Sequence, residues 1–253
     1  MENNVAAPKK KAIILNGSPR RGNSVTMNVT RAFVNGIAAS VPLEAEYINV
    51  IDLKISPCRG CLSCWSRTEG RCIIDNDDIV EVKRKIEEAD YVIESYPLYF
   101  FGMPGIMKVF TDRLLSMMST YVGQRHDIEE KKSLHGIRNE KPGRKLVVIS
   151  SCAQTITDVV FDSLLMQYDC ICGKGNYTPI LCPQLMTMVN SSEKPRLDRY
   201  LKKFEKAGSK FALEGELDEQ TLKNLSLPPF SDSTYKTLLD IFWDKMKKGE
   251  LHV

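Results

Sequence analysis

The sequence predicts an α/β fold, in which a doubly wound parallel sheet of five strands carries helices on both of its faces. Two observations lead to this prediction. Short apolar runs alternate along the chain with longer segments whose apolar residues recur at helical spacing, as strands and crossover helices do. The length of 253 residues, with 43% hydrophobic and 26% charged residues, suits one sizeable core with a modest extension.

The alternation can be followed element by element. The predicted strands are residues 11–16, 43–49, 90–95, 144–151 and 175–182. The predicted helices between them are residues 24–39, 77–89, 104–118 and 156–168. The first strand, KAIILN, is a continuous apolar run that ends in a Gly-Ser-Pro loop, and Pro104 stands in the first turn of the third helix, where proline is favoured.

Three segments lie outside this pattern. We expect a flexible N-terminal tail over residues 1–10, a main domain over residues 11–190, and a helical extension over residues 191–253. Within the main domain, residues 121–143 form a long polar excursion, which in a compact domain is usually functional or disordered. In the extension, Phe242 and Trp243 belong to an amphipathic segment that packs either on its own subunit or on a second one.

Composition excludes several classes of protein. The net charge of +3 is small and the basic residues are scattered, so we expect no nucleic-acid partner. No apolar run approaches the roughly 18–20 residues that a membrane span needs. Eight cysteines with no secretory leader argue against a disulfide scaffold and for thiolate chemistry. We therefore expect a cytoplasmic protein without a membrane partner.

A phosphate-binding loop follows the first strand. Residues 17–24 read GSPRRGNS and lead directly into a helix, whose N-terminus offers free N–H groups and a positive dipole end. Ser18, Asn23 and Ser24 add polar donors, and Arg20 adds a positive charge. Since no Lys-Ser or Lys-Thr pair closes the loop, it suits a monophosphate better than a nucleoside triphosphate. An ordinary capped helix after a turn is the simpler alternative.

A second loop, SYPLYFFGMPG over residues 95–105, follows the third strand. Ligands of open parallel sheets bind beyond the carboxyl ends of strands at the topological switch point, here between the first and third strands. The two loops should therefore lie side by side. Aromatic side chains and backbone amides in the second loop suit a flat ring with polar edges.

Together, GSPRRGNS and SYPLYFFGMPGIMKVFTDR resemble the two FMN-binding loops of the NADPH-dependent FMN reductases, a group of the flavodoxin-like superfamily. The resemblance implies a flavodoxin-like sheet of strand order 2-1-3-4-5, with Ser18, Arg20, Asn23 and Ser24 on the phosphate of FMN. The implied contacts to the ring are Pro97, Leu98, Tyr99, Phe100, Phe101 and Gly102. A third contact, after the fourth strand, would fall at Ser151 and Cys152. The resemblance also implies a homodimer or homotetramer.

Four cysteines, Cys58, Cys61, Cys64 and Cys72, crowd into a short stretch after the second strand. Soft thiolates this close together can converge on one metal centre, and three readings compete: a [4Fe–4S] cluster, a zinc site, and free or redox-active thiols. Zinc sites usually show two CxxC pairs with a longer loop between them, which this spacing lacks. The motif resembles that of the iron–sulfur flavoproteins, which implies a [4Fe–4S] cluster on these four residues.

The resemblance implies an FMN-dependent oxidoreductase that moves electrons from NAD(P)H to a small-molecule or protein acceptor. No catalytic side chain is expected, because the flavin carries the chemistry. The alternatives are a flavodoxin-type electron carrier without enzymatic activity and a zinc-stabilised binding module. His126, His135 and His252 are interpreted as surface histidines, and Asp112 with Arg113 as a pair at a helix surface or an interface.

Overall fold

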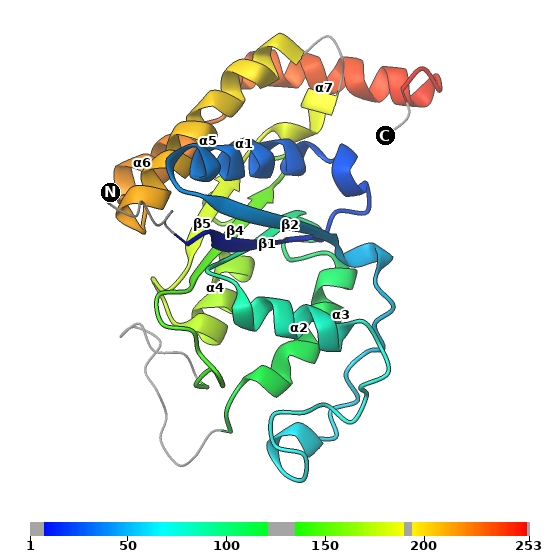
Figure 1. Ribbon diagram of the computed structural model, residues 1–253. Helices are drawn as coiled ribbons and strands as arrows, with labels where there is room; N and C mark the ends of the chain where they lie inside the picture. Colours follow the sequence, from blue (N-terminus) through cyan, green and yellow to red (C-terminus); the bar gives the residue numbers. More distant parts are fainter. Residues whose placement is uncertain (1–7, 121–134, 190–193, 252–253) are drawn as a thin grey trace, which may run out of the picture.

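A computed structural model describes residues 8–120, 135–189 and 194–251. Its centre is a parallel sheet made of β1 (Lys10–Asn16), β2 (Leu43–Asn49), β3 (Tyr91–Pro97), β4 (Lys145–Ser151) and β5 (Thr178–Cys182). The strand order is β2-β1-β3-β4-β5 (Figure 1), which confirms the predicted topology. β1 begins at Lys10, one residue before the expected start of the first strand.

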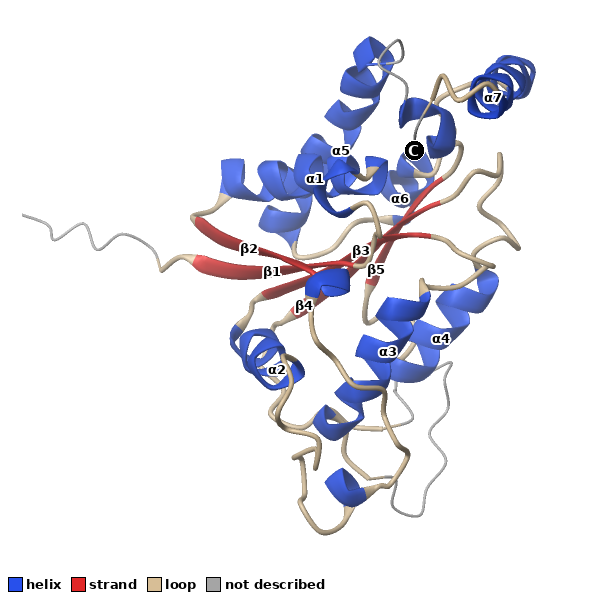
Figure 2. Ribbon diagram, turned by 90° about the vertical axis from the view of Figure 1, so that its right-hand side faces the viewer, coloured by secondary structure: helices blue, strands red, loops and turns tan. Residues whose placement is uncertain are grey.

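Helices cover both faces of the sheet (Figure 2). One face carries α1 (Val25–Ser40) and α5 (Lys194–Glu214), and the other carries α2 (Ile79–Glu88), α3 (Gly105–Arg113) and α4 (Asp162–Cys172). Successive strand residues face opposite layers, so that Ile93 belongs to the α1–α5 core whereas Val92 belongs to the α2–α3–α4 core. The near-continuous apolar strands seen in the sequence reflect this burial on both faces.

Two predicted helices differ from the observed ones. The helix expected over residues 104–118 ends at Arg113 and continues as a 3-10 turn, Leu114–Met117. The helix expected over residues 156–168 begins only at Asp162 and runs on to Cys172. Val159 stands before it with a φ of 66°, and a residue with left-handed backbone cannot continue a right-handed helix.

The C-terminal extension is helical, as predicted, and joins the core of the α1 face. After α5 come α6 (Glu219–Leu225) and α7 (Asp232–Lys247), capped at their N-termini by the side chains of Asp218 and Ser231. Tyr235 and Phe242 of α7 are buried within the chain, whereas Trp243 remains 47% exposed. Of the two expected arrangements, Phe242 therefore shows the first: it packs within its own subunit.

Two glycines let α1 and α5 cross closely. A Cβ atom on Gly36 would lie 1.9 Å from the carbonyl oxygen of Glu205, and a Cβ atom on Gly208 would lie 1.9 Å from that of Phe33. The hydroxyl of Ser209 donates to the carbonyl of Gly36 at 3.0 Å across the same contact. Neither position has room for a side chain while the two helix backbones keep this distance.

Replacing Gly36 with alanine should therefore destabilise the protein, since the added methyl group must push α5 away from α1. We expect a loss near the upper end of the about 1–3 kcal/mol that overpacking of cores usually costs, measured by urea unfolding. Gly105→Ala in α3 is the matched control, because nothing lies within 4 Å of the Cβ it would add. Equal stability of the two variants would contradict the close crossing.

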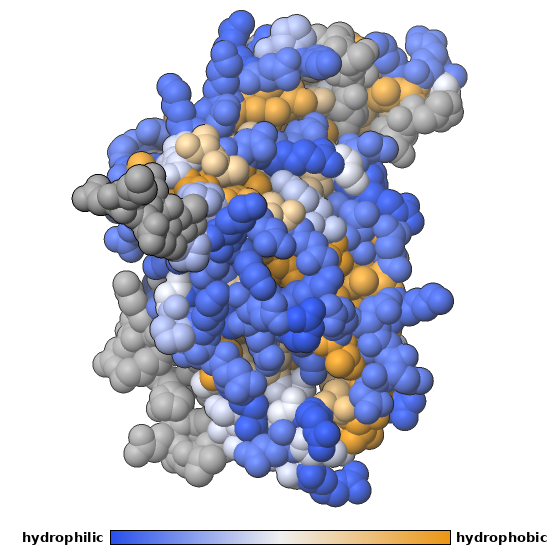
Figure 3. Space-filling model, in the orientation of Figure 1, coloured by the Kyte–Doolittle hydropathy of each residue, from blue (hydrophilic) through white to orange (hydrophobic). Residues whose placement is uncertain are grey.

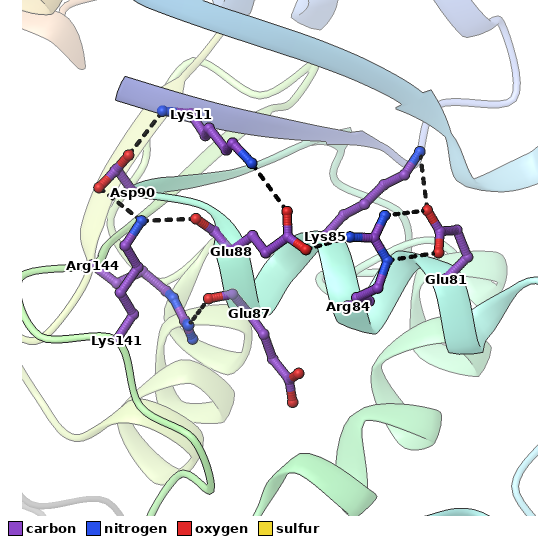
Figure 4. Close-up of polar contacts among 9 residues, drawn as sticks. All are labelled: Lys11, Glu81, Arg84, Lys85, Glu87, Glu88, Asp90, Lys141 and Arg144. Atoms are coloured by element: carbon purple, nitrogen blue, oxygen red, sulfur yellow. Dashed lines mark hydrogen bonds and ion pairs between the residues drawn. The ribbon is translucent and has the colours of Figure 1, made fainter. Parts of the chain in front are cut away.

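Ion pairs surround the amino ends of the central strands (Figure 4). The backbone N–H of Lys11 donates to Asp90 at 2.8 Å, and the ammonium of Lys141 lies 2.9 Å from the same carboxylate. On α2, Arg84 pairs with Glu81 and Glu88. The face seen in Figure 3 is accordingly mostly hydrophilic, with hydrophobic residues in small separate groups. Exposed pairs of this kind contribute little stability individually.

Candidate functional site

The loop after β1 is held in place by its own backbone and by β3. The N–H of Gly17 donates to the carbonyl of Ser95 at 2.9 Å, and that of Ser18 donates to the side chain of Asn16 at 3.0 Å. A Cβ atom on Gly17 would lie 2.0 Å from the side chain of Met107 in α3, so only glycine allows this approach. The loop therefore reaches the N-terminus of α1 in a fixed conformation.

The N-terminus of α1 carries buried donors that lack partners. The first backbone hydrogen bond into the helix is from Asn28 to the carbonyl of Ser24. Among the described residues, the N–H groups of Val25, Thr26 and Met27 donate to no acceptor, although all three residues are buried. The hydroxyl of Ser24 does not cap the helix either. The N–H groups of a first helical turn have no partner within the helix, so these donors offer a place for an anion.

The loops after β3 and β4 lie beside this helix end. The N–H of Leu98 donates to the carbonyl of Ser151 at 2.7 Å, and the hydroxyls of Thr26 and Ser151 are 2.6 Å apart. Beyond Leu98, a tight turn joins Tyr99 to Gly102 and holds Phe100 and Phe101 at φ values of 48° and 62°. Left-handed backbone at two consecutive phenylalanines is unusual, and such strain concentrates at functional sites.

These loops enclose a crevice of about 310 Å³ at the carboxyl ends of the strands. Eight of the predicted site residues line it: Ser18, Arg20, Ser24, Pro97, Leu98, Tyr99, Ser151 and Cys152. The other four, Asn23, Phe100, Phe101 and Gly102, are not among the described residues that line it. Asn23 is exposed in the 3-10 turn before α1, and Phe100 is fully exposed at the tip of its turn.

Sequence reasoning missed part of the wall. Val25, Thr26 and Ala153 lie within two residues of predicted site residues, whereas Leu185 and Met186 come from the segment after β5. Because β5 is the neighbour of β4, its carboxyl end opens at the same edge of the sheet. The position of that loop next to the fourth strand was the signal that could have included it.

The crevice carries a positive charge on Arg20 and an un-ionised thiol on Cys152. Burial lowers the pKa of Arg20, although the phenolic group of Tyr99 opposes this effect, and the guanidinium remains charged at neutral pH. Burial raises the pKa of Cys152 to about 11, so that a neutral thiol lines the crevice at neutral pH. The arrangement can bind an anion, and it offers no activated thiolate.

The four clustered cysteines lie in the segment between β2 and α2 (cyan in Figure 1). Cys64 is buried and Cys61 is exposed, while Cys58 and Cys72 are half-buried; all four are free thiols. Burial raises the pKa of Cys64, and the nearby thiols of Cys72, Cys58 and Cys61 raise it further. No group of three or more ligands at metal-binding geometry is found in the described parts of the chain. The four cysteine side chains, as the structure describes them, therefore do not form a metal-binding group.

A buried ion pair fastens this cysteine segment to α3. The guanidinium of Arg113 donates to Asp77 at 2.5 Å, to the carbonyl of Ser56 at 2.7 Å and to that of Ile74 at 2.6 Å. Its side chain is 1% exposed and that of Asp77 is 7% exposed. Burial disfavours the ionised form of Asp77, but hydrogen bonds from Arg113 and from the N–H of Ser56 outweigh it and lower the pKa of the carboxyl group. Both ends of the cysteine segment thus meet at Arg113.

Two interpretations of the sequence are wrong in detail. Arg113 is not at a helix surface but buried, and its partner is Asp77 rather than the adjacent Asp112, which pairs with Lys108. His135 is half-buried, with its ring 4.8 Å from that of Trp65. Trp65 in turn donates to the carbonyls of Leu115 and Met118. His126 and His252 lie outside the described residues, as does most of the 121–143 excursion.

Comparison with known proteins agrees with this architecture. An iron–sulfur flavoprotein of Methanocaldococcus jannaschii is 39% identical over 103 residues, which are 41% of this chain and 51% of the relative. An FMN-dependent NADH-azoreductase from Bacillus anthracis, solved with FMN, superposes with a TM-score of 0.57 at 18% identity, covering 80% of this chain and all of that one. An NAD(P)H:quinone oxidoreductase from Methanothermobacter marburgensis gives 0.55 at 18% identity, over 81% and 96% of the two chains. At this identity the structural likeness concerns the fold.

The chain spans about half the length of the iron–sulfur flavoproteins it matches. No helix in the described ranges has both the length and the apolar character required to cross a membrane. A family model for the flavodoxin-like fold matches residues 10–158, which include the loops after β1 and β3 and the four clustered cysteines. The chain therefore belongs to the flavodoxin-like family, with iron–sulfur flavoproteins among its relatives, which confirms the resemblance found in the sequence.

Proposed function

We propose that the chain binds FMN in the crevice at the carboxyl ends of β1, β3 and β4, and that it is an NAD(P)H-dependent oxidoreductase. One observation carries the proposal: Val25 and Thr26, whose N–H groups belong to the first turn of α1 and have no partner within the helix, line the crevice together with Ser18, Ser24 and Arg20. The relatives named iron–sulfur flavoproteins and the FMN-containing azoreductase of the same fold support it. FMN, when bound, supplies hydride and electron transfer.

In this proposal the residues of the crevice divide the work. The N–H groups of α1 and the hydroxyls of Ser18 and Ser24 hold the phosphate, with Arg20 balancing its charge. Pro97, Leu98 and Tyr99 flank the ring. Ser151 and Cys152 contact it from the loop after β4. Asn23, Phe100, Phe101 and Gly102 remain predicted contacts at the rim. A cytoplasmic location and a homodimer or homotetramer remain part of the proposal.

Anaerobic stopped-flow mixing of the FMN-loaded protein with NADPH and with NADH tests the enzymatic part. We expect the visible flavin absorption to bleach with at least one nucleotide and to return when a quinone or another small acceptor is added. Bleaching by neither nucleotide would contradict the reductase proposal and would favour an electron carrier that cycles between partner proteins. A protein that takes up no FMN at all would contradict both.

The phosphate site predicts a preference for FMN over riboflavin. Because FMN adds a phosphate that several N–H and O–H donors can reach, we expect it to bind about 100-fold more tightly than riboflavin. Ser24→Ala should weaken FMN about tenfold and leave riboflavin unchanged, as measured by fluorescence titration. Ser40→Ala is the matched control, since Ser40 lies at the other end of α1 and donates to Gly36. Equal binding of FMN and riboflavin would exclude a phosphate site at α1.

We further propose that Cys58, Cys61, Cys64 and Cys72 hold a [4Fe–4S] cluster, which would supply a one-electron centre. The donor type fits such a group, because soft thiolates are the ligands of iron–sulfur clusters, and the names of the relatives support it. A loaded site would require the exposed Cys61 to approach the buried Cys64.

Anaerobic purification should then yield about four iron and four sulfide per chain. Cys64→Ser should lose them, whereas Cys170→Ser, a half-buried cysteine on α4, should retain them. Zinc in place of iron would indicate a structural zinc site, and a chain without either metal would indicate free thiols.

A further inference from the structure

A second cavity, of about 630 Å³, lies between the sheet and the layer formed by α2, α3 and α4. It opens near the amino ends of β3 and β4, where Val92 and Leu146 line it, whereas the crevice described above lies beyond the carboxyl ends. The two share none of the described lining residues. Its volume is in the range of about 300–1,000 Å³ that small-molecule sites occupy.

The walls of this cavity are apolar. Ile86 of α2, Leu115 and Met118 of the segment after α3, and Ile171 of α4 face Val92 and Leu146 of the sheet. α3 ends at Arg113, and Leu114, Leu115 and Met117 of the 3-10 turn that follows it line the cavity. A flat or compact apolar body is the shape that such walls bind.

A buried carboxyl group, that of Glu94 in β3, lines the cavity. The residue is 5% exposed and stands between the apolar Ile93 and the buried Ser95. The hydroxyl of Tyr168 donates to Oε2 of Glu94, and the hydroxyl of Tyr96, 2.5 Å away, donates in turn to Tyr168. Oε1 accepts a hydrogen bond from none of the described residues. Of the two carboxyl oxygens, Oε2 therefore has a hydrogen-bond donor among the described residues and Oε1 has none.

Two other charged groups line the cavity. Asp112 pairs with Lys108 at 2.5 Å. Arg144 donates to the carbonyl of Glu87 at 2.8 Å, while its Nε has no hydrogen-bond partner among the described residues. Within the described residues, no lysine or arginine forms an ion pair with Glu94. His135, Cys58, Cys170 and Cys172 are the remaining titratable lining groups, with Tyr168. A buried carboxyl group without a counter-ion is costly, and a bound cation would relieve that cost.

We propose that this cavity binds a small apolar amine, whose ammonium group donates to Oε1 of Glu94 while its ring or hydrocarbon body packs against the apolar walls. Burial raises the pKa of Glu94 to about 7, against the opposing hydrogen bond from Tyr168, so a bound cation would favour the ionised carboxylate near neutral pH. The proposal is independent of the flavin, because the two cavities share no described lining residue.

Calorimetric titration of the full chain at pH 8, with and without FMN, provides the test. The probes are 2-naphthylmethylamine and its neutral analogue 2-naphthalenemethanol. We expect the amine to bind about tenfold or more tightly than the alcohol, because hydrogen bonds to ionised groups are the stronger ones. FMN should change neither affinity.

Three variants locate the binding. Glu94→Gln should remove the preference for the amine, whereas Asp112→Asn, which alters the other carboxyl group of the cavity, should preserve it. Leu115→Trp should weaken both probes by filling the space. Equal binding of amine and alcohol, no measurable binding of either, or an amine preference that survives Glu94→Gln would overturn the proposal. If Glu94→Gln does not fold, undiminished binding to Leu115→Trp overturns it and weakened binding supports it.

Discussion

Replacing Arg113 with methionine is expected to lower the free energy of unfolding by about 3–5 kcal/mol, because it leaves the Asp77 carboxylate buried without its partner. Arg113 also holds the carbonyls of Ser56 and Ile74, so the whole cysteine segment should loosen. Urea unfolding measures the loss, and limited proteolysis between residues 53 and 78 measures the loosening.

Arg84→Met is the matched control for this prediction. Arg84 also pairs with carboxylates, but its pair with Glu81 is 55% exposed on both sides, and little change is expected. The double variant Arg113→Met with Asp77→Leu should recover part of the loss, since it removes the stranded charge. A loss for Arg113→Met no greater than that for Arg84→Met would mean that the buried pair does not stabilise the fold.

The second large effect is a dependence of stability on pH that originates in Glu94. Burial raises the pKa of Glu94 to about 7 in the folded protein, above the ordinary value of 4.5. The folded state therefore binds a proton more tightly than the unfolded state does. This contribution is fully present below about pH 4.5, is lost as the pH rises to about 7, and amounts to roughly 3 kcal/mol.

Glu94→Gln should remove this loss, so that the variant gains on the wild type by that amount between pH 4.5 and pH 8. The comparison uses urea unfolding at several pH values, and the difference between the two proteins isolates Glu94 from all other titrating groups. Glu44→Gln, on the exposed side of β2, should run parallel to the wild type. A Glu94→Gln curve parallel to that of the wild type would show that Glu94 titrates normally.

Much of the fold was predictable because it depends on local patterns. Short apolar or alternating runs predicted all five strands, and a helix between each successive pair of them implied the parallel sheet. The loop from Gly17 to Ser24 was predictable for the same reason, since its glycines, hydroxyls and following helix are adjacent in sequence. Position at the carboxyl end of a strand then brought Leu98 and Ser151 into the same crevice.

The features that escaped prediction depend on contacts between distant segments. Arg113 looks like an ordinary residue of a helix surface, and only its meeting with Asp77 shows why it is buried. Glu94 reads as the polar end of a strand, although β3 continues to Pro97 and buries it. The ring of His135 contacts that of Trp65, although the two residues are far apart in the sequence. No periodicity within a short window contains such information.

The crossing of α1 and α5 also bears on how the protein is made. Phe33 of α1 packs against Phe211 of α5, with ring centres 5.5 Å apart, and Tyr91 of β3 meets the same ring at 5.9 Å. During translation, the apolar surfaces of α1 and β3 that contact α5 emerge long before α5 itself. Contacts so distant in sequence form late, and exposed apolar surface on a nascent chain attracts chaperones and other chains. The apolar surface of α1 and β3 is therefore exposed to aggregation until α5, which lies more than 150 residues after α1, has been synthesised and has packed against it.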